Sequence, residues 1–305
     1  MPSFIWVSPN VAIFAFFWLV RRGCYTQFQP MCAAVGSIFN FFLVSIGVIL
    51  LWRWNKLSLF NSFLLLGIAG GITSLMLINK LKPQIKGYIG NPGLFTVFNE
   101  HRKYGQWSIL AFLLYWSSGQ ILISGLVPIF LGLAASAAIA AIWNLYRPLS
   151  LLFQSSASIF LPVFSNWLNT GMPLIEFRKR VINLVIIFIG IFLTYGILIT
   201  CFSKLILNFL YCGKYDRYIL LVPLWSIALS ASISINLFNM ALKALGLVRY
   251  SSIIWGMSTG ITLTLGIPMI LFFGINGALL CLTFSYILAA VVSFLLVYKQ
   301  TARDV

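Results

Sequence analysis

A single basic side chain, Arg147, interrupts an otherwise uncharged stretch of this sequence that runs from Trp107 to Ser165. Two apolar segments in it, 107–131 and 137–163, each exceed the roughly 20 residues that a helix needs to cross a bilayer. Arg147 then lies near mid-depth of the second, where a guanidinium costs at least about 2.5 kcal/mol unless it faces water or a partner. Its characteristic chemistry is anion binding, because the planar group makes bidentate hydrogen bonds to phosphate or carboxylate.

Polar side chains recur around Arg147 at helical spacing. At about 100° per residue, one face of its helix collects Asn144, Arg147, Gln154, Ser155 and Ser158, and one face of the preceding helix collects Ser117, Gln120, Ser124 and Pro128. We therefore predict two polar stripes that line one positively charged cavity. The candidate binding residues are Arg147, Asn144, Gln154, Ser155, Gln120 and Ser117. The alternative for Arg147 is a structural role, with its side chain snorkelling or paired to backbone.

Pro148 follows Arg147 directly and lacks a backbone N–H. Within a helix it would leave the carbonyl of Asn144 free for water or a ligand. A simple packing kink is the alternative.

The composition excludes an ordinary soluble domain. Of the 305 residues, 61% are hydrophobic and 8% charged, and the mean hydropathy is +1.01, whereas soluble domains are about a quarter charged. Continuous apolar runs of 17 or more residues disfavour a β-barrel, whose strands alternate over about ten. The sequence therefore predicts an all-α polytopic membrane protein.

The net charge of +16 does not indicate nucleic acid here, because the basic residues punctuate apolar spans as membrane anchors. Membrane lipids are the expected contacts. The five cysteines show no CxxC pattern, so we expect packing roles for them, without a metal site or a cofactor.

Nine spans are predicted: Phe4–Val20, Met31–Trp52, Leu57–Asn79, Trp107–Leu131, Ala137–Val163, Val181–Phe202, Tyr218–Leu242, Tyr250–Phe273 and Ile275–Tyr298. The longest connection, after the third span, divides the chain. We assign 1–90 to the second half of an N-terminal helix lobe, 91–106 to a cytoplasmic inter-lobe loop, and 107–305 to a complete six-helix lobe.

The distribution of basic residues predicts the orientation. Fourteen of the twenty lie on the side that includes the C-terminus, five lie on the other side, and Arg147 is within a span. The positive-inside rule makes the first side cytoplasmic and the N-terminus external. An external N-terminus without a signal segment predicts that an odd number of upstream spans is missing; a natural nine-span protein is the alternative.

Evidence for an enzyme is thin. His101 stands beside Glu100, but adjacent helical residues point about 100° apart and no third group is visible. Asp216 is the only carboxylate on the predicted external side, whereas a membrane polymerase or glycosyltransferase would need a catalytic acid or base there. We expect that the protein is not an enzyme. A membrane-embedded polysaccharide polymerase or glycosyltransferase is the alternative.

The run YGQWSILAFLLYWSSGQILISGLVPIFLGLAASAAIAAIWNLYRPLSLLFQSSASIFLPVFSNW resembles the seventh and eighth helices of bacterial polysaccharide-biosynthesis and O-antigen flippases. These belong to the multidrug/oligosaccharidyl-lipid/polysaccharide (MOP) transporter superfamily. FWLVRRGCYTQFQP, LYCGKYDRYILLVPLW and FGINGALLCLTFSYILAAVVSFLLVYK are similar to segments after the fourth helix, at the start of the tenth, and in the twelfth. The resemblance implies that the first three of twelve helices are absent.

The resemblance also implies a function. Such proteins flip an undecaprenyl-diphosphate-linked oligosaccharide, such as an O-antigen or exopolysaccharide unit, across the bacterial cytoplasmic (inner) membrane by alternating access through a cationic cavity. In related flippases cavity arginines meet the diphosphate, and Arg147 matches that role by position. Further candidate contacts are Arg21, Arg22, Lys243 and Trp116, whose ring could stack on sugar or simply face core or lipid. Implied partners are polysaccharide polymerase and chain-length regulator proteins.

A small-molecule exporter of the same superfamily is the other alternative. Drug-exporting relatives usually keep carboxylates within their spans for ion coupling, and the predicted spans here contain none.

Overall fold

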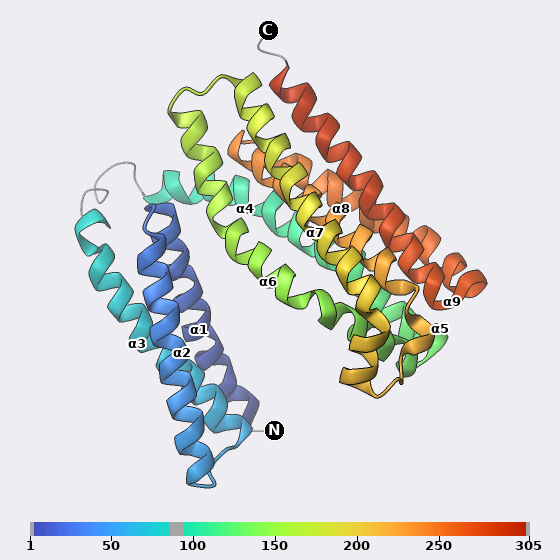
Figure 1. Ribbon diagram of the computed structural model, residues 1–305. Helices are drawn as coiled ribbons and strands as arrows, with labels where there is room; N and C mark the ends of the chain where they lie inside the picture. The colour runs from blue at the N-terminus through green and yellow to red at the C-terminus, as the bar shows by residue number, and fades with distance from the viewer. Residues whose placement is uncertain (1–2, 86–93, 303–305) are drawn as a thin grey trace. The chain divides into compact units, whose positions relative to one another are not determined.

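The computed structural model describes residues 3–85 and 94–302, all of them in helices or the turns between helices (Figure 1). Continuous apolar sequence favours helices here because a helix satisfies its own backbone hydrogen bonds within a bilayer. The chain forms two compact units, Met1–Leu94 and Phe95–Val305.

The first unit consists of α1 (Ser3–Thr26), α2 (Pro30–Arg53) and α3 (Leu59–Ile85). Its core gathers Phe17, Val20, Cys24, Ala33, Leu77 and Leu81. Close approach of α1 and α3 depends on small residues: a Cβ on Gly70 would lie 3.3 Å from the Phe14 ring. Small residues permit such packing between membrane helices.

The second unit begins with α4 (Leu94–Trp116), the π-helix η1 (Ser117–Leu126), α5 (Val127–Leu131) and α6 (Leu133–Asn169). It continues with α7 (Leu174–Tyr211), the short 3₁₀ helix η2 (Asp216–Tyr218), α8 (Leu221–Ala244) and α9 (Val248–Thr301). The most buried of these is α8, with 61% of its apolar window inside the structure. Helix α8 is therefore the centre around which this unit packs.

The long helix α9 is a hairpin of two arms. Gly274 breaks it with φ 59° and ψ −137°, a backbone conformation that favours glycine. The arms 248–273 and 275–301 run antiparallel, because Ser258 Oγ lies 2.7 Å from Ser285 Oγ and Cys281 Sγ lies 4.0 Å from the carbonyl oxygen of Ile261. The two arms therefore correspond to the last two predicted spans, Tyr250–Phe273 and Ile275–Tyr298, and the break lies at the one residue between them.

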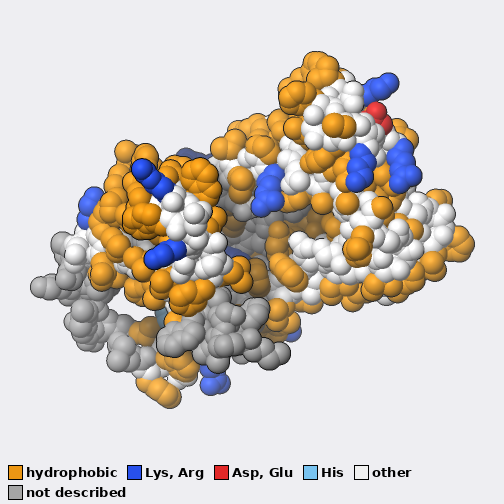
Figure 2. All heavy atoms as spheres, turned by 90° about the horizontal axis from the view of Figure 1, so that it is seen from below, with side chains coloured by type: hydrophobic (Ala, Val, Ile, Leu, Met, Phe, Trp, Pro, Cys, Tyr) orange, Lys and Arg blue, Asp and Glu red, His pale blue; other side chains and the backbone are white. Residues whose placement is uncertain are grey.

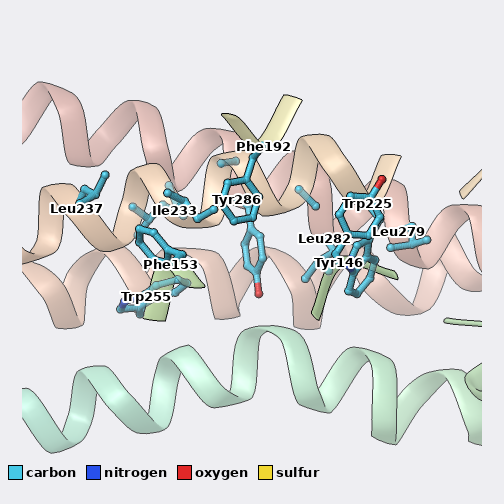
Figure 3. Close-up of a cluster of buried hydrophobic side chains, with 14 of the residues drawn as sticks. Tyr146, Phe153, Phe192, Trp225, Ile233, Leu237, Trp255, Leu279, Leu282 and Tyr286 are labelled. Atoms are coloured by element: carbon cyan, nitrogen blue, oxygen red, sulfur yellow. The ribbon is translucent and has the colours of Figure 1, made fainter. Parts of the chain in front are cut away.

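Figure 3 shows part of the main core of the second unit, an aromatic and aliphatic cluster to which α6, α7, α8 and α9 contribute. Tyr146 and Phe153 come from α6, Phe192 from α7, Trp225 from α8 and Tyr286 from α9. Several rings meet edge to face, including Phe153 with Phe188 and Phe192, a favoured aromatic geometry. This cluster fixes the rotation of α6 about its axis.

Within the described residues, seven helices are long and apolar enough to cross a membrane. The nine predicted spans differ from these seven helices in two ways: they include α1, and they count the two arms of α9 as separate spans. Outer faces are apolar, as Figure 2 shows for one side; Phe41 is 65% and Phe272 81% exposed. Exposed apolar faces on helices of this length are those of a multi-pass membrane protein.

Two local features differ from the sequence-based expectation. Helix α4 begins at Leu94, so the part of the predicted 91–106 loop from Leu94 onward is helical. The sequence from Leu94 to Gln106 contains no proline, and charged residues such as Arg102 and Lys103 are good helix formers. The segment Ser117–Leu126 is a π-helix, whose i→i+5 hydrogen bonds widen each turn, so the assumed 100° spacing does not apply to it.

Candidate functional site

The polar residues predicted on α6 share its exposed face. Asn144, Arg147, Gln154 and Ser155 are all exposed, whereas the opposite face, which includes Ile142, Leu145, Tyr146 and Phe153, is buried. Ser155 donates its hydroxyl to the carbonyl of Leu151, and Ser158 donates to that of Ser155. Both hydroxyls keep lone pairs that can accept further hydrogen bonds.

Hydrogen bonds on the buried side hold this helix in place. The Tyr146 hydroxyl donates to the carbonyl oxygen of Val222 on α8 at 2.9 Å. The Tyr195 hydroxyl, from α7, donates to the carbonyl oxygen of Leu145 at 2.8 Å. Tyr146 is fully buried, and its ring meets that of Tyr195 edge to face. Tyr146 faces inward, and Arg147, about 100° further round the helix, is exposed.

Arg147 has no ion pair, hydrogen bond or ring contact with any described residue of the second unit. Among the residues that the structure describes, the one ion pair joins Arg180 to Glu176, both on α7, at 2.6 Å. Asp216 lies in η2, away from α6 in sequence. The Arg147 guanidinium therefore keeps its hydrogen-bond donors available to an external anion.

The predicted stripe on 117–128 is only partly continuous. Gln120 and Ser124 are exposed, and the Ser124 hydroxyl lies 2.9 Å from the side-chain oxygen of Gln120. Ser117 and Pro128 are half-buried. The widened π-helical turn explains why Ser117 does not follow the same exposed surface.

Two side-chain hydroxyls donate hydrogen bonds to backbone carbonyls where α4 passes into η1. Thr259 on α9 donates to the carbonyl of Leu114, and Ser118 donates to that of Tyr115, both at 2.8 Å. Gly119 lies close to Tyr286, whose hydroxyl oxygen a Cβ would approach to 2.9 Å. Such bonds compete with the helical ladder, and π-helical turns of this kind are frequent at functional sites.

The remaining candidate residues lie elsewhere. Arg21, in the first unit, donates to Ser37 Oγ at 3.2 Å and its Cζ stands 4.2 Å from the centre of the Trp18 ring; Arg22 is exposed. In the second unit, Lys243 is half-buried near the end of α8, and Trp116 is exposed at the end of α4. Among the described residues of the second unit, no hydrogen bond or ring contact joins Trp116 to the side chains on α6.

A basic and aromatic cleft was missed by sequence reasoning. It has a volume of about 710 Å³ and lies between α4 and the start of α9. Lys103, Tyr104 and Trp107 line one side, and Arg249 and Tyr250 line the other. In the sequence, Lys103 and Arg249 served only to predict the orientation. The two segments are about 145 residues apart, so their proximity depends on tertiary packing and could not be predicted.

No family model matches the chain, and no curated protein matches it. Solved structures do share its fold. A mutant of the Vibrio cholerae MATE transporter VcmN matches with a TM-score of 0.79 and 17% identity, over 99% of this chain and 69% of that one. The bent form of VcmN matches with a TM-score of 0.78 and 18% identity over the same shares.

An outward-facing multidrug resistance MATE family transporter of the MOP superfamily matches with a TM-score of 0.74 and 15% identity, over 90% of this chain and 62% of that one. This chain therefore spans about two thirds of the length of the transporters it resembles. With the all-helical architecture, these likenesses show that the chain has the fold of MATE transporters of the MOP superfamily.

Proposed function

We propose that this protein is a membrane transporter that flips an undecaprenyl-diphosphate-linked oligosaccharide across the bacterial cytoplasmic membrane. Alternating access of a cationic cavity would carry the polar head of the lipid across, with Arg147 as the principal contact for the diphosphate. Asn144, Gln154 and Ser155 would supply hydrogen bonds around it. The fold supports the transporter class, and the side chains on α6 support the choice of cargo.

The observation that carries this proposal is that Arg147 is exposed and has no partner among the described residues of the second unit. Its helix is held on the opposite face by Tyr146 and Tyr195, so the guanidinium is presented outward without a described acid beside it. A diphosphate is an anion that must cross a low-dielectric slab, and a bidentate arginine contact suits it.

The charge on this face argues against an exporter of organic cations. A cation would be repelled by Arg147, and no described acidic side chain occupies the exposed face of α6. Of the described carboxylates, Glu176 is paired with Arg180 at the start of α7 and Asp216 lies outside the long helices. An anionic cargo fits this distribution better.

A flipping assay tests the proposal. The full chain is reconstituted in liposomes with a fluorescent undecaprenyl-diphosphate-linked oligosaccharide, and a membrane-impermeant reductant bleaches the label in the outer leaflet. Flipping exposes the inner-leaflet pool, so we expect bleaching well beyond one half. Bleaching that stops at one half, together with uptake of an organic cation by the same liposomes, would favour the exporter.

Two variants sharpen the assay. Arg147→Ala should slow flipping, whereas Lys204→Ala, which removes an exposed cation from α7, should leave it unchanged. Equal slowing by both would indicate a general effect of surface charge.

A further inference from the structure

We propose that the cleft between α4 and the start of α9 binds the headgroup of an anionic phospholipid at the membrane surface. This site is separate from the cargo face on α6, and it does not depend on the proposed cargo. The cleft's volume of about 710 Å³ is within the range of small-ligand sites, about 300 to 1,000 Å³.

The cleft is positively charged. Lys103 and Arg249 line it on opposite walls, and no acidic side chain is among its described lining residues. Both cations are exposed, and neither forms an ion pair with a described residue. The first turn of α9 adds partial positive charge, since Leu247 at its N-cap gives no side-chain capping bond. An anion is therefore the expected occupant.

Contacts within the protein hold the walls of the cleft in place before a lipid binds. Ser252 of α9 donates to the carbonyl of Trp107 on α4 at 2.8 Å. The Arg249 Cζ lies 5.4 Å from the centre of the Trp107 ring, a cation–π contact that positions the guanidinium and leaves its edge N–H groups available. Gln300 donates to the Tyr250 hydroxyl at 3.2 Å. Binding would thus require little ordering of this site.

A lipid fits better than a soluble phosphate. Tyr104, Trp107 and Tyr250 line the cleft. Trp107 stands where the polar part of α4 gives way to its apolar part, and Tyr250 lies in the first turn of α9. Aromatic residues at such positions mark the headgroup level of a membrane. Leu247 and Ile253 add apolar lining, and Ile253 is 50% exposed. Cations beside an exposed apolar wall match an amphiphile with a phosphate head and acyl chains.

Native mass spectrometry of the full chain in detergent measures this binding. Phosphatidylglycerol and phosphatidylcholine with identical acyl chains are titrated separately. We expect phosphatidylglycerol to bind at least about tenfold more tightly, and Lys103→Gln combined with Arg249→Gln to remove that preference. Ile253→Trp should also weaken binding by filling the cleft while both charges remain.

The matched control is Lys214→Gln combined with Arg217→Gln. These two cations also stand beside tyrosines, but they line a cleft of only about 130 Å³, which is too small for a headgroup. This control should retain phosphatidylglycerol as the wild type does. The proposal is overturned if the Lys103/Arg249 variant also retains it, or if both lipids bind equally. Displacement by inorganic phosphate at the lipid's own concentration would overturn the lipid as occupant.

Discussion

The hydroxyl of Tyr195 lies 2.8 Å from the carbonyl oxygen of Leu145, a hydrogen bond that ties α7 to α6 two residues before Arg147. The Tyr146 hydroxyl makes the corresponding bond to Val222 on α8. Two bonds from adjacent residues of α6 thus set the direction in which Arg147 points. Since an arginine contact to phosphate depends on geometry as well as charge, this packing determines whether the site is preorganised.

Tyr146→Phe should destabilise the second unit by about 1 to 3 kcal/mol, because the buried carbonyl of Val222 loses its hydroxyl partner while the ring still fills the core. Denaturant unfolding in detergent measures the change. Tyr298→Phe is the control, since Tyr298 is 49% exposed, and it should stay within about 0.5 kcal/mol of wild type. Equal stability of the two variants would contradict the role assigned to Tyr146.

Gly277→Ala should disrupt the hairpin of α9. A Cβ on Gly277 would overlap the backbone carbonyl of Met269 on the other arm, and backbone cannot move aside as a flexible side chain can. We expect a loss of about 1 to 3 kcal/mol in unfolding free energy. Gly260→Ala, at an open position of the same helix, should be neutral or slightly stabilising. A neutral Gly277→Ala would show that the arms do not pack as described.

Reporter fusions test the predicted orientation. Fusions after Lys86, Arg180 and Val305 should report the cytoplasm, and fusions near Lys56 and Lys214 should report the outside, because fourteen basic residues flank the first side and five the second. A C-terminal fusion that reports the outside would reverse the orientation.

Asp216→Asn separates transport from membrane-enzyme activity. Asp216 lies in η2 and is half-buried, and an enzyme that acts at the outer face would need its carboxylate as acid or base. We expect surface-polysaccharide display to be unchanged at normal protein level. Loss of display with intact protein would instead support the polymerase or glycosyltransferase alternative.

The amino-acid sequence predicts much of this fold because apolar length and helical spacing are local properties. The break at Gly274 and the polar face around Arg147 follow directly from residue order. The π-helix does not, since it depends on tertiary bonds such as Thr259 to the carbonyl of Leu114. The cleft between Lys103 and Arg249 likewise requires that distant helices meet.

Surface-polysaccharide display with Arg147→Ala, measured in cells that depend on this protein, tests most directly whether Arg147 binds the cargo. Losing a charge-assisted bidentate contact should weaken cargo binding by about 1.5 to 3 kcal/mol, roughly 10- to 150-fold. Arg147→Lys should rescue display only partly, because an ammonium supplies charge without the planar fork. Protein level should be normal, since Arg147 is exposed and has no partner among the described residues of the second unit. We expect a strong loss of display with Arg147→Ala, and wild-type display at normal protein level would contradict the role of Arg147 as the contact for the diphosphate.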